Sequence, residues 1–449
     1  MLRITQLAKD AFMAVLVCTT FLAGPAWPQA RALPSGNVQA IYQRLYQKTE
    51  HIKIFDHHAP PGFGDDSDVD AHATPPQHQP LRARETNPEL ALAAKSLFGY
   101  PYSDMSEEHM RWLAEKSAAA EKGGSTAYWD QILDQCGIEA SVANRVAMPG
   151  YLNPKRFRWV FFVDSFLFPF DNKLVTGENP DEGVYIPLQE KVLHRYMQQA
   201  GISQLPDDFD AYLAFITRIL EENRKRGGIA IKFEAAYFRS LYFADPPREA
   251  AAAVYQKYRA GGVPSPEEYT TFQDYVFRHL VREGGRLHLP VHFHSAIGEG
   301  DYFSLRRGDV LNLENVLKDP RYLDTTFVLL HGGYPYFREI IWLASMKNVF
   351  IDTSEIEVLL YPSEFKIPLK LWLQLYPEKI TFGSDAYPYN AALGSEETYW
   401  QGVQSARTAL AAALAEMVAA GEITEGKALE IARGYLHDNA IRLYPPATQ

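Results

Sequence analysis

Short apolar runs that end at polar residues recur along the chain. Eight of them have the length of a strand, and they lie at 52–55, 138–143, 157–163, 229–231, 289–294, 326–330, 349–351 and 379–383. Apolar runs of this length, bounded by polar and turn residues, favour β-strands, so we predict eight strands. Segments with helical patterns lie between and around them, at 33–50, 88–135, 209–226, 265–284, 336–346, 364–375 and 396–444.

Alternating strands and helices predict the α/β class, and specifically a (β/α)8 TIM-like barrel with helical insertions over its C-terminal rim. Active sites of that fold lie at the C-terminal ends of the strands, which is where the polar residues stand in this chain. A doubly wound open sheet is the competing architecture. It more often carries a glycine-rich phosphate loop after its first strand, and this sequence has none there. We assign residues 33–449 to the barrel, with a helical insertion at 60–135 over the mouth.

The N-terminus has the features of an export signal. Arg3 and Lys9 precede an apolar run at 11–23, and a small-residue cleavage site follows, so we predict a signal peptide at 1–32. A retained membrane anchor is the alternative, but the run is short of the roughly 20 residues needed to cross a bilayer. Cys136 is the single cysteine after this segment, which leaves no internal disulfide. We expect an exported protein, periplasmic in a Gram-negative source, with no membrane attachment after cleavage.

Composition narrows the class of partner. Hydrophobic residues make up 47% of the chain and aromatic residues 13%, which is enough apolar material for a folded core. The formal net charge is −11, and the sequence has no Lys- or Arg-rich run long enough to follow a phosphate backbone. We therefore expect a small-molecule substrate and no nucleic-acid partner. A homo-oligomer remains open.

Chemistry-bearing side chains stand at the ends of the predicted strands. In a barrel, His58, Lys232, His294, His331 and Asp385 would converge on one rim although they lie far apart in sequence. Imidazoles with a carboxylate offer N/O ligands for a divalent cation, most naturally zinc, with manganese and iron as further options. Such an ion makes bound water a nucleophile, and a strand-end carboxylate can accept its proton.

One strand carries two histidines. His292 and His294 stand two residues apart, a spacing that places both on the same face of a strand. A pair of hydrogen-bonded core histidines is the alternative to a pair of ligands.

Five motifs resemble those of a known family. They are Leu-Pro-Val-His-Phe-His-Ser-Ala-Ile-Gly-Glu-Gly-Asp at 289–301, Leu-Leu-His-Gly-Gly-Tyr-Pro-Tyr-Phe-Arg-Glu at 329–339, Asn-Val-Phe-Ile-Asp-Thr-Ser at 348–354, Thr-Phe-Gly-Ser-Asp-Ala at 381–386 and Asp-Asn-Ala-Ile-Arg-Leu-Tyr at 438–444. They are similar to motifs of the amidohydrolase-related (amidohydrolase 2) family of metal-dependent hydrolases. Within it, the chain resembles the branch of the amidohydrolase-like half of fungal FluG and plant nodulin/glutamine-synthetase-like proteins. The resemblance is strongest from 229 to 444 and fades between 60 and 228.

The resemblance implies a TIM-like barrel with a metal at its mouth. By motif position, His294 matches the fifth-strand metal ligand and His331 the sixth-strand catalytic histidine. Asp385 matches the eighth-strand aspartate that ligates metal and acts as the base, and His58 belongs to the first-strand ligand motif. Lys232 falls where some relatives carry a carboxylated lysine that bridges two metals. An ordinary lysine that binds a substrate carboxylate or forms an ion pair is the alternative.

The first strand departs from the family pattern. The family's Asp-x-His-x-His becomes Asp56-His57-His58-Ala59-Pro60, so Pro60 stands where the second histidine is expected. Either His57 or His292 substitutes for it, or the metal is bound weakly, or catalysis has been lost. On a regular strand His57 points away from His58, so both reach one ion only if the strand carries a bulge.

Two arginines are candidates for substrate binding beside Lys232. Arg239 could clamp a substrate carboxylate through its planar fork, or it could be structural, paired with Glu234 or Asp245. Arg145 stands at a strand end and could line the pocket. A buried ion pair with Asp164 is its alternative.

These observations lead to a metal-dependent hydrolase in which activated water attacks an amide, lactone or ester carbonyl. Specificity is expected to reside in the segments over the mouth, at 60–135, 165–208 and 237–266. A metal-dependent decarboxylase of the same fold is one alternative. The other alternative is a catalytically impaired barrel that acts as a binding protein, which is suggested by Pro60.

Overall fold

The computed structural model describes residues 37–63, 79–121, 125–298 and 300–444. The predicted signal peptide at 1–32 lies outside these residues, as does part of the predicted insertion at 60–135. No helix within the described ranges combines the length and the apolar character that a membrane span needs.

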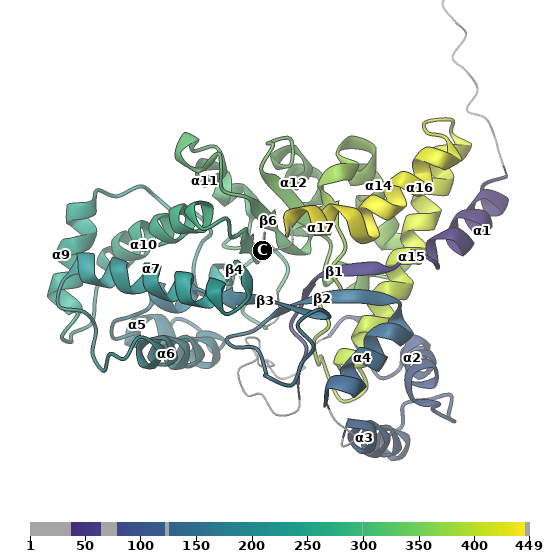
Figure 1. Ribbon diagram of the computed structural model, residues 1–449, viewed down its shortest axis with the longest axis horizontal. Coiled ribbons are helices and arrows are strands. Elements are labelled where there is room, and N and C mark those ends of the chain that lie inside the picture. The colour runs from purple at the N-terminus through teal and green to yellow at the C-terminus, as the bar shows by residue number, and fades with distance from the viewer. Residues whose placement is uncertain (1–36, 64–78, 122–124, 299, 445–449) are drawn as a thin grey trace, which may run out of the picture.

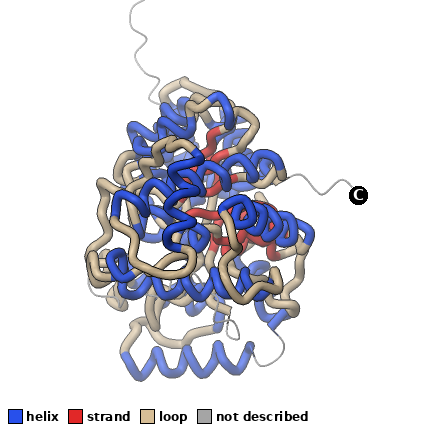
Figure 2. The backbone as a smooth tube through the Cα atoms, turned by 90° about the vertical axis from the view of Figure 1, so that its left-hand side faces the viewer, coloured by secondary structure: helices blue, strands red, loops and turns tan. Residues whose placement is uncertain are grey.

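The centre of the molecule is a barrel of eight parallel strands in sequential order, which confirms the predicted α/β barrel (Figures 1 and 2). The strands are β1 (Ile54–Ala59), β2 (Ile138–Asn144), β3 (Phe157–Phe162), β4 (Gly228–Phe233), β5 (Val291–Phe293), β6 (Phe327–Leu329), β7 (Val349–Asp352) and β8 (Ile380–Thr381). Two backbone hydrogen bonds join the last strand to the first. His57 N–H donates to the Phe382 carbonyl at 2.9 Å, and Asp385 N–H donates to the His58 carbonyl at 2.8 Å.

The strands are apolar because helices cover the outside of the barrel while side chains fill its inside. Each predicted run overlaps one observed strand, and the largest difference is in β1. That strand begins two residues later than predicted, and it includes the predicted strand-end polar residues. Asp56 pairs with Ser141 while Ala59 pairs with Ala143, so β1 has one residue more than β2 over this stretch. The bulge that the sequence required for two inward histidines is therefore present.

Helices surround the strands. In chain order they are α1 (Val38–Thr49), α2 (Pro88–Phe98), α3 (Glu107–Glu121), α4 (Ser125–Cys136), α5 (Lys173–Thr176), α6 (Glu182–Gln199), α7 (Phe209–Lys225), α8 (Ala235–Phe238), α9 (Arg248–Tyr258), α10 (Pro266–Arg286), α11 (Glu314–Leu317), α12 (Phe337–Leu343), α13 (Ile356–Leu359), α14 (Pro362–Leu375), α15 (Ser395–Ala419), α16 (Glu425–Arg433) and α17 (Asn439–Leu443). Helices α2, α3 and α4 fall between β1 and β2. The segment at 237–266, expected to lie over the mouth, contains the second half of α8 and all of α9.

Local sequence explains where several of these helices begin. Ser265 caps α10 by accepting a hydrogen bond from Glu268 N–H, and Ser265 N–H donates in return to the Glu268 carboxylate, which completes a capping box. Pro266 occupies the first helical position, where its missing N–H is not needed. Asp208 caps α7 in the same way through Ala211 N–H. Both helices therefore start at the residues that their caps predict.

The C-terminal segment closes the N-terminal end of the barrel. Phe55, Val142 and Ala230, which lie on β1, β2 and β4, form one apolar cluster with Ala440 and Tyr444. The Tyr444 ring stacks on Phe55 with a centroid separation of 6.3 Å. In Figure 1, α17 accordingly lies across the strands near the centre of the view.

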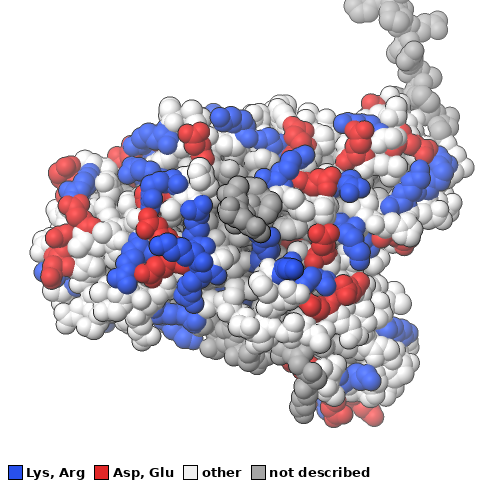
Figure 3. All heavy atoms as spheres, in the orientation of Figure 1, with Lys and Arg blue, Asp and Glu red and all other residues white. Residues whose placement is uncertain are grey.

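On the face seen in Figure 3, basic and acidic side chains are interspersed.

Candidate metal centre

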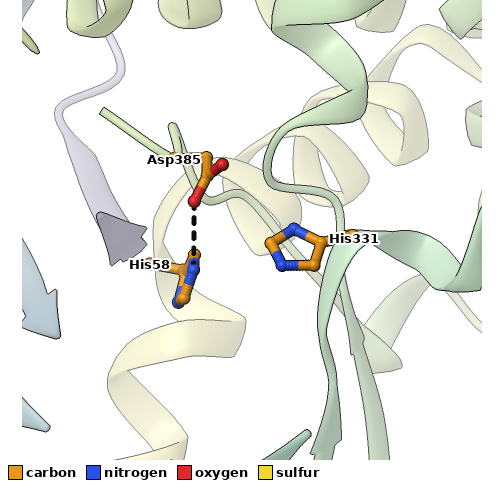
Figure 4. Close-up of side chains that lie close together, drawn as sticks. All are labelled: His58, His331 and Asp385. Atoms are coloured by element: carbon orange, nitrogen blue, oxygen red, sulfur yellow. Dashed lines mark ion pairs between the residues drawn. The ribbon is translucent and has the colours of Figure 1, made fainter. Parts of the chain in front are cut away.

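Three side chains from β1 and from the loops after β6 and β8 meet at the C-terminal end of the barrel. His58, His331 and Asp385 each offer a ligand atom, and these atoms all lie within 4.8 Å of one another. The Nε2 of His58 is 3.1 Å from Oδ1 of Asp385, and Figure 4 shows the His331 ring facing this pair. All three side chains are buried. We call this group the His58 cluster.

The backbone turns sharply to present two of these side chains. His331 has φ 59° and Asp385 has φ 46°, in the left-handed region that residues other than glycine seldom adopt. Gly332 and Gly333 continue the left-handed turn at φ 57° and 55°, which glycine adopts without a steric penalty. The Gly-Gly pair in the 329–339 motif thus serves to reverse the chain immediately after His331. Strain of this kind is concentrated at functional sites.

His294 lies next to the His58 cluster but is not part of it. Its Nδ1 is 3.0 Å from Nε2 of His331, while its own Nε2 is buried and has no hydrogen-bond partner among the described residues. That Nε2 faces Gly298, where a Cβ would come within 3.0 Å. The structure therefore brings the predicted fifth-strand ligand to the site, one imidazole away from the His58–Asp385 pair.

His57 and His292 occupy a different place. The bulge turns both His57 and His58 inward, yet His57 binds Asp352, with its Nδ1 3.1 Å from Oδ2. The Nε2 atoms of His57 and His292 both contact the hydroxyl of Tyr444, at 2.7 and 2.6 Å. The two conditional ligands thus share a hydrogen-bond network below the His58 cluster, and neither is among its three members.

Lys232 is buried beside these groups. Its Nζ is 3.8 Å from Oε1 of Glu234 and 5.9 Å from the centre of the Phe162 ring. This geometry places an ion pair in the barrel interior, which was one of the two alternatives for Lys232.

The two candidate arginines are held by other parts of the protein. Arg239 donates to Asp274 at 2.5 Å and to Gln273 at 2.9 Å, and its guanidinium lies over the Phe243 ring. This placement favours its structural alternative, although the partner differs from Glu234 and Asp245. Arg145 is buried and donates to the Pro61 carbonyl at 2.6 Å, so it holds the backbone that follows Pro60.

Burial sets the protonation of the site. It lowers the pKa of the His58, His294 and His331 imidazoles, and the positive charge of Lys232 acts in the same direction on all three. Burial also raises the pKa of Asp385, against the opposing effect of His331 and Lys232. Neutral imidazoles keep a lone pair for a cation, and a carboxylate with a raised pKa is a stronger base.

The donor set of the His58 cluster fits a borderline divalent cation. Imidazole nitrogens and one carboxylate oxygen are the ligands that zinc and its neighbours prefer. The buried Nε2 of His294, which has no hydrogen-bond partner in the part of the chain that the structure describes, is a further potential ligand atom close by. His58, His331 and Asp385 would hold the ion.

Sequence reasoning missed several residues that contact the site residues, and four of them illustrate why. Asn144 contacts Nδ1 of His58, Ser354 contacts Nδ1 of His331, Asp352 holds His57, and Tyr444 bridges His57 to His292. Asn144 and Asp352 stand at the ends of apolar runs, which is the signal that could have identified them. Tyr444 ends the motif at 438–444, but that motif does not indicate its partner, which lies almost 400 residues earlier along the chain.

Aromatic side chains form a wall beside His294. The Tyr237 ring lies 4.5 Å from the His294 ring, Phe303 packs against both, and Tyr185 contacts Tyr237 at 4.9 Å. Tyr185 belongs to the first turn of α6, so that helix contributes to the wall.

Glu182, at the start of α6, is expected to make stability depend on pH. Burial raises its pKa to about 8, so the native state keeps a proton that the unfolded chain releases near pH 4. The free energy of unfolding is therefore highest at low pH and falls as the pH rises towards 8. The decrease is on the order of 1 kcal/mol per pH unit. We expect Glu182→Gln to abolish this decrease. The stability of the variant relative to the wild type should therefore increase between about pH 5 and about pH 8.

Urea unfolding of both proteins across this pH range measures the effect. Glu249→Gln is the control, because Glu249 lies exposed in the first turn of α9. A constant difference between Glu182→Gln and the wild type at all pH values would contradict the prediction.

Comparisons with known proteins agree with the fold and with the motifs. Residues 230–445 match the amidohydrolase family model, which confirms the resemblance seen in the sequence. A segment of 157 residues is 27% identical to protein fluG of Emericella nidulans, covering 34% of this chain and 17% of the fungal protein. The match thus spans a small part of that relative, and the FluG branch rests on this segment.

Solved structures show the same architecture. A protein assigned as a metal-dependent hydrolase from Lactobacillus casei superposes with a TM-score of 0.58 at 17% identity, covering 89% of this chain and 97% of that one. Glucuronate isomerase from Caulobacter crescentus gives a TM-score of 0.61 at 14% identity, with 94% and 98% covered. At these identities the likeness establishes the barrel fold and leaves the reaction open.

Proposed function

We propose that the protein is a metal-dependent hydrolase of a small molecule, on the premise that residues 230–445 match the amidohydrolase family model. The bond cleaved is an amide, lactone or ester bond, attacked by water at its carbonyl carbon. The observation that carries the proposal is the convergence of His58, His331 and Asp385 within 4.8 Å at the C-terminal rim of the barrel. That rim is where barrels of this kind carry their chemistry.

The residues of this chain have separate roles in the proposed reaction. A divalent cation, when bound, supplies a Lewis acid that makes water nucleophilic near neutral pH. His58 and His331 are neutral because of burial, and each presents a ring nitrogen to the cluster. Asp385 accepts the proton of the attacking water, a task that suits a carboxylate whose pKa burial has raised.

Further groups orient these side chains. The Tyr389 hydroxyl donates to Oδ2 of Asp385 at 3.1 Å, which holds the carboxylate while Oδ1 faces His58. The aromatic wall of Tyr185, Tyr237 and Phe303 supplies an apolar surface next to His294 for the substrate. We propose zinc as the metal, and an exported, periplasmic location, as the sequence predicts.

Metal content and activity together test this function. Elemental analysis of the purified protein should find bound zinc, manganese or iron, and Asp385→Ala and His294→Ala should each lose hydrolysis of the amide, lactone or ester that the wild type cleaves. Loss of about two orders of magnitude or more is the size expected for a general base. A metal-free wild type with full activity would sink the proposal. Release of carbon dioxide in place of a hydrolysis product would assign the decarboxylase alternative.

A binding protein without catalysis is the second candidate, and Pro60 is the observation that favours it. Pro60 follows β1 where the family has a ligand, and a proline side chain has no donor atom. If this candidate is correct, the wild type holds less than one metal per chain and Pro60→His raises the metal affinity. Stoichiometric metal in the wild type would exclude it.

A further inference from the structure

Asp352, the last residue of β7, holds two hydrogen-bonded arms inside the barrel. In the upper arm, Oδ1 accepts from the backbone N–H of Ser354 at 2.9 Å and from the Ser354 hydroxyl. The Ser354 Oγ is in turn 3.0 Å from Nδ1 of His331. This arm connects the carboxylate to a member of the His58 cluster through one serine.

The lower arm runs to the N-terminal end of the barrel. Oδ2 of Asp352 is 3.1 Å from Nδ1 of His57, and Nε2 of His57 is 2.7 Å from the hydroxyl of Tyr444. The same hydroxyl is 2.6 Å from Nε2 of His292. Every side chain in both arms is buried, so these bonds are formed without competition from bulk water.

The charge on Asp352 decides the direction of the hydrogen bonds that connect it to His331 and to Tyr444. Burial by itself raises the pKa of this carboxyl, but the hydrogen bonds from His57 and Ser354, together with the electrostatic effect of the His57 and His58 rings, hold the pKa below its usual value. An ionised carboxylate only accepts, so the Ser354 hydroxyl and Nδ1–H of His57 both donate to it. Because the Ser354 hydroxyl donates its proton to Asp352, its Oγ can only accept a hydrogen bond from Nδ1–H of His331. Nε2 of His57 likewise accepts from the Tyr444 hydroxyl.

Two more acceptors surround the same nitrogen of His331. The Ser354 carbonyl lies 3.2 Å from Nδ1, and Oε2 of Glu355 lies 3.5 Å from it. All the neighbours of Nδ1 thus favour a proton there. Nε2 of His331, which lies 3.0 Å from Nδ1 of His294, is then left with its lone pair. Metal ligation requires a ring nitrogen that carries no proton.

We propose that Asp352 is a positioning residue, which fixes the proton of His331 on Nδ1 and so leaves the Nε2 of this member of the His58 cluster with its lone pair, with Tyr444 as its anchor at the opposite end of the barrel. The use of that lone pair as a metal ligand rests on the proposed function. The site is built tightly around the carboxylate. A Cβ at Gly383, just after β8, would lie 2.4 Å from Oδ2 of Asp352, so a side chain at position 383 would collide with the carboxylate.

The proton positions can be measured directly. NMR of the metal-free, full-length protein with 15N-labelled histidine identifies which nitrogen of each imidazole carries the proton. We expect His331 and His57 to be protonated on Nδ1 in the wild type. Asp352→Asn should populate both tautomers of His331, because an amide can donate as well as accept. A wild-type His331 protonated on Nε2 would overturn the proposal.

Zinc affinity of the same variants gives the second readout. Removing a hydrogen-bond partner of a metal ligand typically lowers affinity by about 10- to 100-fold, and we expect a loss of this size in Asp352→Asn. Ser354→Ala breaks the upper arm alone and provides the test if Asp352→Asn does not fold. Tyr444→Phe should lower zinc affinity measurably and shift the His57 and His292 signals.

Tyr435→Phe is the matched control. It removes a buried tyrosine hydroxyl from the same C-terminal segment, one that contacts Thr353 Oγ1 at 2.8 Å and lies outside both arms. Wild-type zinc affinity in Asp352→Asn, or equal effects of Tyr444→Phe and Tyr435→Phe, would refute the positioning role. Failure of the wild type to bind zinc would refute the proposed function instead, and the histidine tautomers would still decide this inference.

Discussion

Zinc added to the metal-free protein is expected to raise its free energy of unfolding by about 2.7 kcal/mol once free zinc reaches about 100 times its dissociation constant. The stabilisation arises because the folded chain binds the ion and the unfolded chain does not. His58, His331 and Asp385 come from the first, sixth and eighth strand regions, and the closed barrel alone brings them within 4.8 Å. Urea unfolding in chelator and in buffered zinc measures the difference.

Variants separate this site from adventitious zinc. His58→Ala and Asp385→Ala should each abolish the stabilisation, because each removes a donor from a group of three. His109→Ala is the matched control, since His109 forms another histidine–carboxylate pair, with Asp104 at 2.8 Å on the surface at α3. His109→Ala should show the same zinc-induced rise in the free energy of unfolding as the wild type. If zinc stabilised Asp385→Ala as much as the wild type, the bound zinc would lie at another site.

Gly332→Ala is expected to destabilise the protein by about 2 to 4 kcal/mol, from backbone strain and overpacking together. Gly332 has φ 57°, a conformation that costs a side-chain-bearing residue roughly 1 to 2 kcal/mol. An added Cβ would also lie 2.3 Å from Cη2 of Trp372, a buried indole of α14 that donates to the Phe337 carbonyl. Denaturant titration of the variant against the wild type measures the cost.

Two further variants divide that cost into its parts. Gly99→Ala carries the strain without the clash, because Gly99 has φ 68° and its added Cβ would meet nothing within 4 Å. It should cost roughly 1 kcal/mol. Trp372→Phe removes the ring atoms nearest to the new methyl group. The double variant of Trp372→Phe and Gly332→Ala should therefore lose less stability than the two single variants lose in sum. Strictly additive effects would show that Trp372 does not limit the space.

The sequence predicted the strands well because both faces of a barrel strand are buried. Burial of both faces produces continuous apolar runs, and the rim produces polar residues where each run ends, as at Asn144 and Asp352. Helix caps such as Ser265 and Asp208 are equally local, since a side chain satisfies a backbone N–H three residues away. The (β/α)8 fold and the candidate set of His58, His294, His331 and Asp385 could be inferred from patterns of this kind.

Tertiary structure alone decided how that set is arranged. Sequence order does not show that a bulge in β1 turns both His57 and His58 inward, or that Asp352 and Tyr444 hold His57 apart from the metal donors. Nor does it show that Asp274 binds Arg239. Each of these contacts joins distant segments, and the bonds that a polar group makes inside a barrel depend on which neighbours the closed sheet places around it. Residue type and spacing therefore determined which groups reach the rim, and barrel closure determined which of them meet.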